Sequence, residues 1–133
     1  MSRSAIYTAN TGSQAVAVGG TINLGGIVRR FGCAVDLNGG TINLTEQGYY
    51  DVDISITAEP TAAGTVTATL YNGGIAVPGA TASATAAAAG DPVNLSIDAM
   101  VRVPCCGNSG SLSVVLSGGA ATVTNIVAVV EKL

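Results

Sequence analysis

The chain has 133 residues, of which 48% are hydrophobic, 4% are aromatic and 10% are charged, a composition that excludes disorder and fits one globular domain spanning residues 1–133. Five basic residues against eight acidic ones, with a net charge of −3, exclude an electrostatic site for nucleic acid. Histidine, the commonest general base and metal ligand, is absent, which argues against an enzyme.

Short runs of strand-forming residues, separated by many of the 18 glycines, follow one another along the whole chain. From these runs we expect about nine to ten strands and an antiparallel β-sandwich or barrel. The expectation of about nine to ten strands is drawn from eleven strand-like runs, which in chain order are residues 5–10, 15–18, 21–24, 27–37, 41–44, 48–57, 65–71, 74–77, 93–103, 111–116 and 122–133.

The run 48–57 carries the clearest strand pattern, because apolar and polar residues alternate along it. One face consists of Tyr50, Val52, Ile54 and Ile56. The other face consists of Tyr49, Asp51, Asp53, Ser55 and Thr57. This pattern predicts a strand with one face in the core and one face outside it.

Turn signals divide the middle of the chain. Asn72-Gly73 lies between two strand-like runs and favours a type I′ hairpin, in which both central residues have positive φ. Residues 80–90 are rich in Ala and Thr, which favours a loop or an edge strand of small residues. The sequence GGTINL occurs at 19–24 and again at 39–44, which we interpret as two similar strand starts after flexible turns.

The last predicted strand is apolar on both faces. Ile126, Ala128 and Val130 share one face, and Val127, Val129 and Leu133 share the other. A strand with one wet face shows polar residues at alternate positions, so we expect something outside the chain to cover the second face. Self-association is the usual solution, the alternative being a monomer with a surface rich in Thr, Ser and Ala. The resulting candidates for the core or a subunit interface are Tyr50, Val52, Ile126, Val127, Val129 and Leu133.

Tyr49, Asp51 and Asp53 form a candidate ligand or ion face, because alternate residues of a strand lie about 6.5–7 Å apart on one side. Two carboxylates at this spacing are able to bind Ca²⁺ if other chains supply further oxygens, or to act as acid and base. We expect instead that they face solvent or pair with arginine side chains from elsewhere in an assembly. The candidate partners are Arg29, Arg30 and Arg102. We predict no catalytic residue, no metal site and no cofactor, with Ca²⁺ as the alternative.

The three cysteines are Cys33 and the adjacent pair Cys105-Cys106. We expect them to be small buried side chains, with a disulfide or a metal shared between subunits as alternatives. The first residues contain no apolar run typical of a secretory signal, and the long uncharged stretches are broken by Gly and Pro. We therefore expect a soluble product of the cytoplasm without a membrane span.

Two motifs resemble the C1q/TNF-like jelly rolls. Gly48-Tyr49-Tyr50-Asp51-Val52 resembles their Gly-x-Tyr-x-Phe strand, with Val52 where an aromatic residue is usual, and residues 70–74 resemble the Leu-x-x-Asn-Gly hairpin that follows it. The apolar strand that ends the chain is similar as well. The resemblance implies that the first and last strands are neighbours in an inner sheet, and that this sheet packs around a threefold axis to form a homotrimer.

Within that family, a small chain without a leader and rich in Gly, Ala and Thr looks like the jelly rolls of phages and prophages of gut bacteria. The resemblance thus implies a non-enzymatic homotrimer in a phage virion, made in the bacterial cytoplasm, as capsid decoration, head fibre or fibre-tip module. The alternative is an adhesin of the same fold that binds carbohydrate or a cell surface. The implied partners are the chain itself, with phage capsid proteins or a host-surface glycan, and neither nucleic acid nor membrane.

Overall fold

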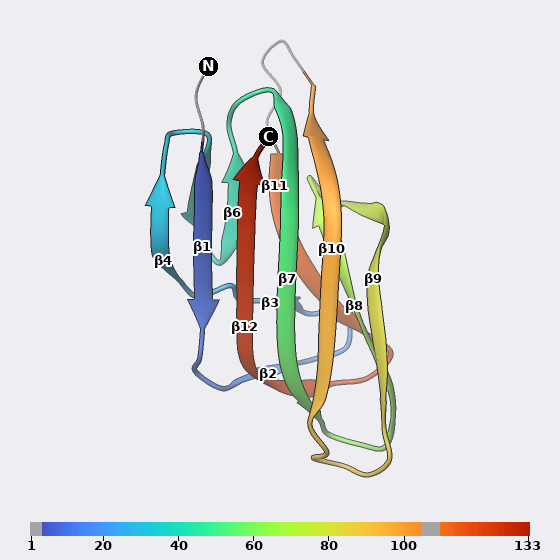
Figure 1. The fold of residues 1–133 in the computed structure, drawn as a ribbon. Helices are drawn as coiled ribbons and strands as arrows, with labels where there is room; N and C mark the ends of the chain where they lie inside the picture. The colour runs from blue at the N-terminus through green and yellow to red at the C-terminus, as the bar shows by residue number, and fades with distance from the viewer. Residues whose placement is uncertain (1–3, 105–109) are drawn as a thin grey trace.

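Two antiparallel sheets face each other in the computed structural model, which describes residues 4–104 and 110–133 (Figure 1). Sheet A has the strand order β10 (Val93–Val103), β7 (Gly48–Pro60), β12 (Ala121–Lys132), β1 (Ala5–Asn10) and β4 (Gly26–Phe31), and β2 (Gln14–Val16) also pairs with β12. Sheet B has the order β5 (Val35–Asn38), β6 (Thr41–Leu44), β11 (Gly110–Ser117), β8 (Gly64–Asn72) and β9 (Ile75–Ala86), and β3 (Thr21–Ile22) also pairs with β11. The prediction of an all-β antiparallel sandwich is confirmed, with twelve strands in the described residues where about nine to ten were expected.

The core lies between the sheets and is built by the alternation that the sequence shows. Along β7 every second residue from Tyr50 to Ala58 is buried, whereas Tyr49, Asp51 and Asp53 are exposed. The facing strands of sheet B contribute branched aliphatic side chains such as Leu70 to the same core. Burial of this apolar surface, at about 25 cal/mol per Å², is the main force that holds the sheets together.

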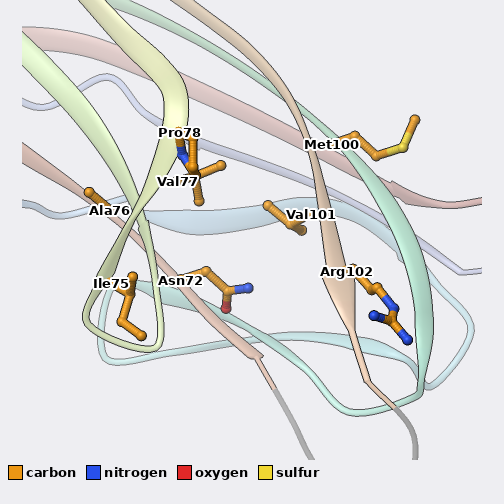
Figure 2. Close-up of a pocket in the computed structure, with 8 residues that line it drawn as sticks. All are labelled: Asn72, Ile75, Ala76, Val77, Pro78, Met100, Val101 and Arg102. Carbon is orange, nitrogen blue, oxygen red and sulfur yellow. The ribbon is translucent and has the colours of Figure 1, made fainter.

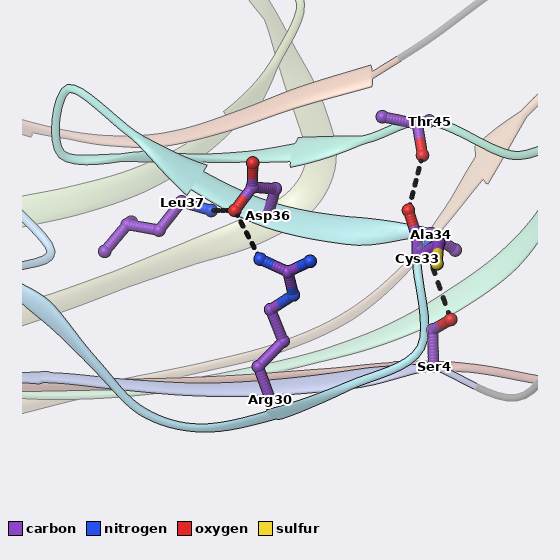
Figure 3. Close-up of polar contacts among 7 residues, drawn as sticks. All are labelled: Ser4, Arg30, Cys33, Ala34, Asp36, Leu37 and Thr45. Atoms are coloured by element: carbon purple, nitrogen blue, oxygen red, sulfur yellow. Dashed lines mark hydrogen bonds and ion pairs between the residues drawn. The ribbon is translucent and has the colours of Figure 1, made fainter.

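Residues 27–37 do not form one strand, so that prediction is wrong. They divide into β4 in sheet A and β5 in sheet B, joined by a bend in which Gly32 has φ +83°. Apolar and polar residues alternate through this segment, so the sequence pattern does not reveal the bend. The chain changes direction at Gly32, because glycine adopts a positive φ at low cost. The two strands are linked by an ion pair between Arg30 Nη1 and Asp36 Oδ1, 2.9 Å apart (Figure 3).

Side chains from neighbouring segments fix this bend (Figure 3). The Ala34 N–H donates to Ser4 Oγ at 3.1 Å, and Thr45 Oγ1 donates to the Cys33 carbonyl at 3.0 Å. The Cys33 side chain is exposed, so the expectation that it is buried is wrong: Cys33 lies in the bend between β4 and β5 and not on the inner face of a strand. Cys105 and Cys106 lie outside the described residues.

The β8–β9 hairpin has a two-residue turn, shifted by one position from the prediction. Gly73 (φ +63°) and Gly74 (φ +85°) are the central residues, and Asn72 pairs with Ile75. Glycine adopts positive φ without a Cβ penalty, so Gly73-Gly74 suits the two central positions and Asn72 becomes the last residue of β8. The following Ala- and Thr-rich segment is an edge strand as far as Ala86, one of the two predicted possibilities.

The first and last strands are neighbours, as the family resemblance implied: β1 pairs with β12 from Ala5↔Glu131 to Asn10↔Ile126. The two GGTINL copies lead into β3 and β6, which both pair with β11 but at different positions along it. Within residues 4–104 and 110–133 there is no helix with the length and hydropathy needed to cross a membrane.

Candidate interaction face

The candidate site is the outer face of sheet A, meaning the side that points away from the core. Antiparallel pairing places its side chains in rows that cross the five strands from β4 to β10. The first row is Phe31, Ala5, Glu131, Asp51 and Met100. The second row is Arg29, Tyr7, Val129, Asp53 and Asp98.

The half of this face over β4, β1 and β12 is apolar. Tyr7, Phe31 and Val129 are 38%, 60% and 37% exposed, and every residue of β4 is exposed. They surround a shallow hollow of about 80 Å³. Its lining consists of Ala5, Ile6, Tyr7, Arg29, Phe31 and Val129. An edge strand with aromatic and aliphatic side chains open to water is a surface that soluble proteins normally cover.

The other part of the face, over β7, β10 and the Glu131 end of β12, carries four carboxylates, with Arg102 of β10 beside them opposite Tyr49. Pairing sets Asp53 opposite Asp98 and Asp51 opposite Glu131, and these four carboxylates are exposed. Burial raises the pKa of Asp51 above the ordinary value, and the charges of Asp98, Asp53 and Glu131 raise it further. The ion pair that the described residues form, Arg30–Asp36, lies at the β4–β5 bend and not in this cluster.

No group of three or more His, Cys, Asp or Glu side chains in the described part of the chain is arranged to hold a metal ion. Asp51, Asp53, Asp98 and Glu131 form a charged surface, and the alternative that Ca²⁺ binds there with oxygens from other chains stays a prediction. This surface is suited to bind a cationic group of another molecule, because its four carboxylates repel one another in the free chain.

The residues singled out from the sequence fall into two groups. Tyr50, Val52 and Ile126 are completely buried in the core. Val127 is half-buried and Val129 exposed on the outer face of sheet A, while Leu133 is 65% exposed beyond the end of β12. Tyr49, Asp51 and Asp53 all lie on that same outer face, with Tyr49 half exposed.

A tyrosine suits position 50 of β7, because its ring packs in the core and its hydroxyl has a hydrogen-bond partner. Its ring is fully buried, and its hydroxyl donates a hydrogen bond of 2.7 Å to the Glu46 carbonyl. Burial raises the pKa of the Tyr50 hydroxyl, the hydrogen bond to the Glu46 backbone lowers it, and the Glu46 charge raises it. Tyr50 therefore anchors the start of β7, from which Tyr49 and Asp51 project outward.

Sequence reasoning missed several members of the face: Tyr7, Phe31, Asp98, Met100 and Glu131. A signal for two of them was present in the run 93–103, where Asp98 and Met100 occupy the polar alternate positions. The alternation within one strand does not predict which strands lie beside β7. The cluster of four carboxylates was therefore not predictable from it.

A second hollow, of about 310 Å³, opens between β9 and β10 at the opposite edge of the sandwich (Figure 2). Val77 and Val101 point toward each other across it, whereas Met100 and Arg102 point to the other side of β10. Ile75, at the end of the β8–β9 hairpin, is 75% exposed at its rim. Met100 thus belongs to the outer face of sheet A.

The outer face of sheet B contrasts with that of sheet A. Threonine and serine hydroxyls of β8 and β9 pair across the strands, with oxygen–oxygen distances of 2.9 Å for Thr65–Thr85, 2.9 Å for Thr67–Ser83 and 3.4 Å for Thr69–Thr81. This ladder is uncharged, polar and satisfied within the chain. Because these hydroxyls are polar, the outer face of sheet B is able to face water although the chain has few charged residues.

No protein-family model matches the sequence, and no curated protein matches it. Solved structures do match. A TNF from S. frugiperda, Eiger, has a TM-score of 0.69 at 12% identity and covers 98% of this chain and 91% of its own. The globular domain of zebrafish complement 1qA has a TM-score of 0.68 at 9% identity, covering 97% and 94%. The PRD1 vertex protein P5 has a TM-score of 0.56 at 14% identity, covering 97% and 95%. The fold of this chain is the TNF/C1q-like jelly-roll β-sandwich.

Proposed function

We propose that this chain is a non-enzymatic structural protein of a bacteriophage virion, in which three copies assemble through the outer face of sheet A. The observation that carries the proposal is the apolar half of that face, where Tyr7, Phe31 and Val129 surround a hollow and are open to water in a single chain. Aromatic side chains, Met and Arg are the residue types enriched in the cores of protein interfaces, and all three types occur on this face.

The threefold arrangement rests on the resemblance of the Gly48–Val52 and 70–74 motifs to the C1q/TNF-like jelly rolls. The pairing of β1 with β12 in sheet A supports it, because that family places these strands in the sheet around its threefold axis. The role in a phage particle is supported by the similarity to PRD1 vertex protein P5. Since one fold hosts many functions, the role in the particle needs its own test.

Assembly is tested first. Size-exclusion chromatography with light scattering at micromolar concentration is expected to give three times the chain mass. Val129→Asp, which places a charge in the apolar half of the face, is expected to give the mass of one chain with unchanged circular dichroism. Thr85→Asp adds the same charge on the outer face of sheet B and serves as the matched control. A wild-type protein that stays monomeric at these concentrations overturns the proposal.

The virion role is tested separately. Mass spectrometry of purified particles of the phage that encodes the chain is expected to detect it in a fixed ratio to the major capsid protein. Its absence from particles would contradict the virion role even if the trimer forms. The alternative, an adhesin, predicts specific signals on a glycan array that depend on Tyr49 and Asp51, and the structural role predicts none.

A further inference from the structure

The outer face of sheet A carries groups of opposite charge at its two edges. The four carboxylates Asp51, Asp53, Asp98 and Glu131 lie over β7, β10 and β12, together with Arg102 at the end of β10 (Figure 2), whereas Arg29 lies on β4 at the opposite edge. Four strand spacings separate β4 from β10, about 19 Å, so Arg29 and Asp98 are too far apart to pair within one chain.

The apolar groups are separated in the same way. The hollow beside Phe31 lies at the β1–β4 edge, and Met100, a flexible apolar side chain that is 59% exposed, projects from β10 at the other edge. The β10 edge therefore carries the carboxylate Asp98 and the apolar Met100, with Arg102 beyond them, and the β4 edge carries the cation Arg29 and the apolar Phe31. The hollow and the Met100 side chain are both apolar, so contact between them would remove apolar surface from water.

The two complementary pairs also share their register in the sheet. Arg29 and Asp98 are the two ends of one cross-strand row, and Phe31 and Met100 are the two ends of the row beside it. A contact that sets the β10 edge of one copy beside the β4 edge of the next in this register brings Asp98 to Arg29 and Met100 to Phe31 together.

We infer that copies of this chain join head to tail, with Arg29 of one copy bound to Asp98 of the next and Met100 of that next copy seated in the hollow beside Phe31. The inference rests on the proposed assembly and assigns the residues that set its register. Arg29 would bring a cation to the Asp53–Asp98 pair, which has no ion-pair partner within the described part of the chain. A head-to-tail contact closes into a ring when the rotation between copies closes, and the proposed trimer is such a ring of three copies.

Charge reversal tests the assignment. Arg29→Asp and Asp98→Arg are each expected to raise the concentration of half-assembly by about tenfold or more, because each sets like charges against each other at every contact. The chain that carries both reversals restores the opposite-charge pair and is expected to return close to the wild-type value. Asp91→Arg makes the same charge change as Asp98→Arg, but in an exposed loop, and serves as the control. Circular dichroism of each variant checks that the subunit remains folded.

Mixing the two single variants sharpens the test. In a ring with an odd number of copies, two identical neighbours always meet, so the mixture is expected to recover only part of the assembly, whereas a two-fold dimer would recover all of it. A trimer that is unaffected by either reversal, or that the double variant does not restore, overturns the Arg29–Asp98 contact and leaves the proposed trimer standing. A wild-type monomer overturns both.

Discussion

Asp53 lies directly opposite Asp98 in the antiparallel pairing of β7 and β10, so two carboxylates of like charge face each other on one side of sheet A. Opposed like charges destabilise a strand pair. Asp98→Asn is therefore expected to raise the free energy of unfolding of the dilute, unassembled subunit by about 0.5 kcal/mol at pH 7. Urea denaturation at low salt measures this change. Asp91→Asn, in an exposed loop, is the control, and an unchanged or reduced stability for Asp98→Asn would contradict the repulsion.

The raised pKa of Asp51 gives a pH dependence with a defined sign. Because the folded chain holds the Asp51 proton more tightly than the unfolded chain does, ionisation of this group costs stability above its folded pKa. As pH falls from 7 through that raised value toward the ordinary one of about 3.9, the cost is relieved and this group's contribution to stability increases. Neutralising Asp98, Asp53 or Glu131 is expected to lower the Asp51 pKa.

Nuclear magnetic resonance titration of the Asp51 carboxyl carbon measures the shift directly. Denaturation of the unassembled subunit between pH 7 and pH 4 provides the linked stability, with Asp51→Asn as the variant that lacks this contribution. An Asp51 titration midpoint at or below the ordinary value would refute the prediction.

Substitutions at two neighbouring valines of β12 distinguish an effect on assembly from an effect on folding. Val130 is completely buried between the sheets, whereas Val129 lies on the outer face. Val130→Asp is expected to cost several kcal/mol, because it buries an unpaired charge. Val129→Asp and Val127→Asp are expected to spare the isolated subunit and to disrupt the assembly. Thermal melting and light scattering on the same samples distinguish the two effects, and loss of folding in Val129→Asp would show that this position belongs to the core.

The fold was predictable from local sequence pattern, because alternation along β7 and β10 reflects burial of one side of each strand. Residues 5–10, 41–44 and 93–103 coincide with strands β1, β6 and β10 for the same reason. The division of residues 27–37 between two sheets was not predictable, because alternation does not report the direction change at Gly32. The bend depends on contacts that Ser4 and Thr45 make from other segments.

The candidate face was only partly predictable. Tyr49, Asp51 and Asp53 share one strand, so their common side follows from the period of two. Asp98 and Glu131 come from strands distant in sequence, and their register against β7 is fixed by the whole sandwich. The expected pairing of Asp51 or Asp53 with an arginine of another copy stays a prediction. Among the described residues, Arg30 forms an ion pair with Asp36.

Gly25 and Gly74 allow the position of β4 to be tested with a matched pair of substitutions. Both have almost the same positive φ, +86° and +85°, so alanine at either position carries a similar backbone strain of about 1 kcal/mol. A Cβ at Gly74 meets open space, but a Cβ at Gly25 would collide with the Ala9 carbonyl oxygen and with Asn10 on β1.

Gly25→Ala is therefore expected to cost about 1–3 kcal/mol more than Gly74→Ala, because backbone is unable to move aside as a flexible side chain does. Denaturation of both variants measures the difference. Because the collision forces the start of β4 away from β1, Gly25→Ala is also expected to weaken assembly, whereas Gly74→Ala, where the added Cβ meets open space, is expected to leave the position of β4 unchanged. Equal losses of stability in the two variants would show that β4 tolerates a shift at its start, and assembly by a stable Gly25→Ala chain would place the interface away from β4.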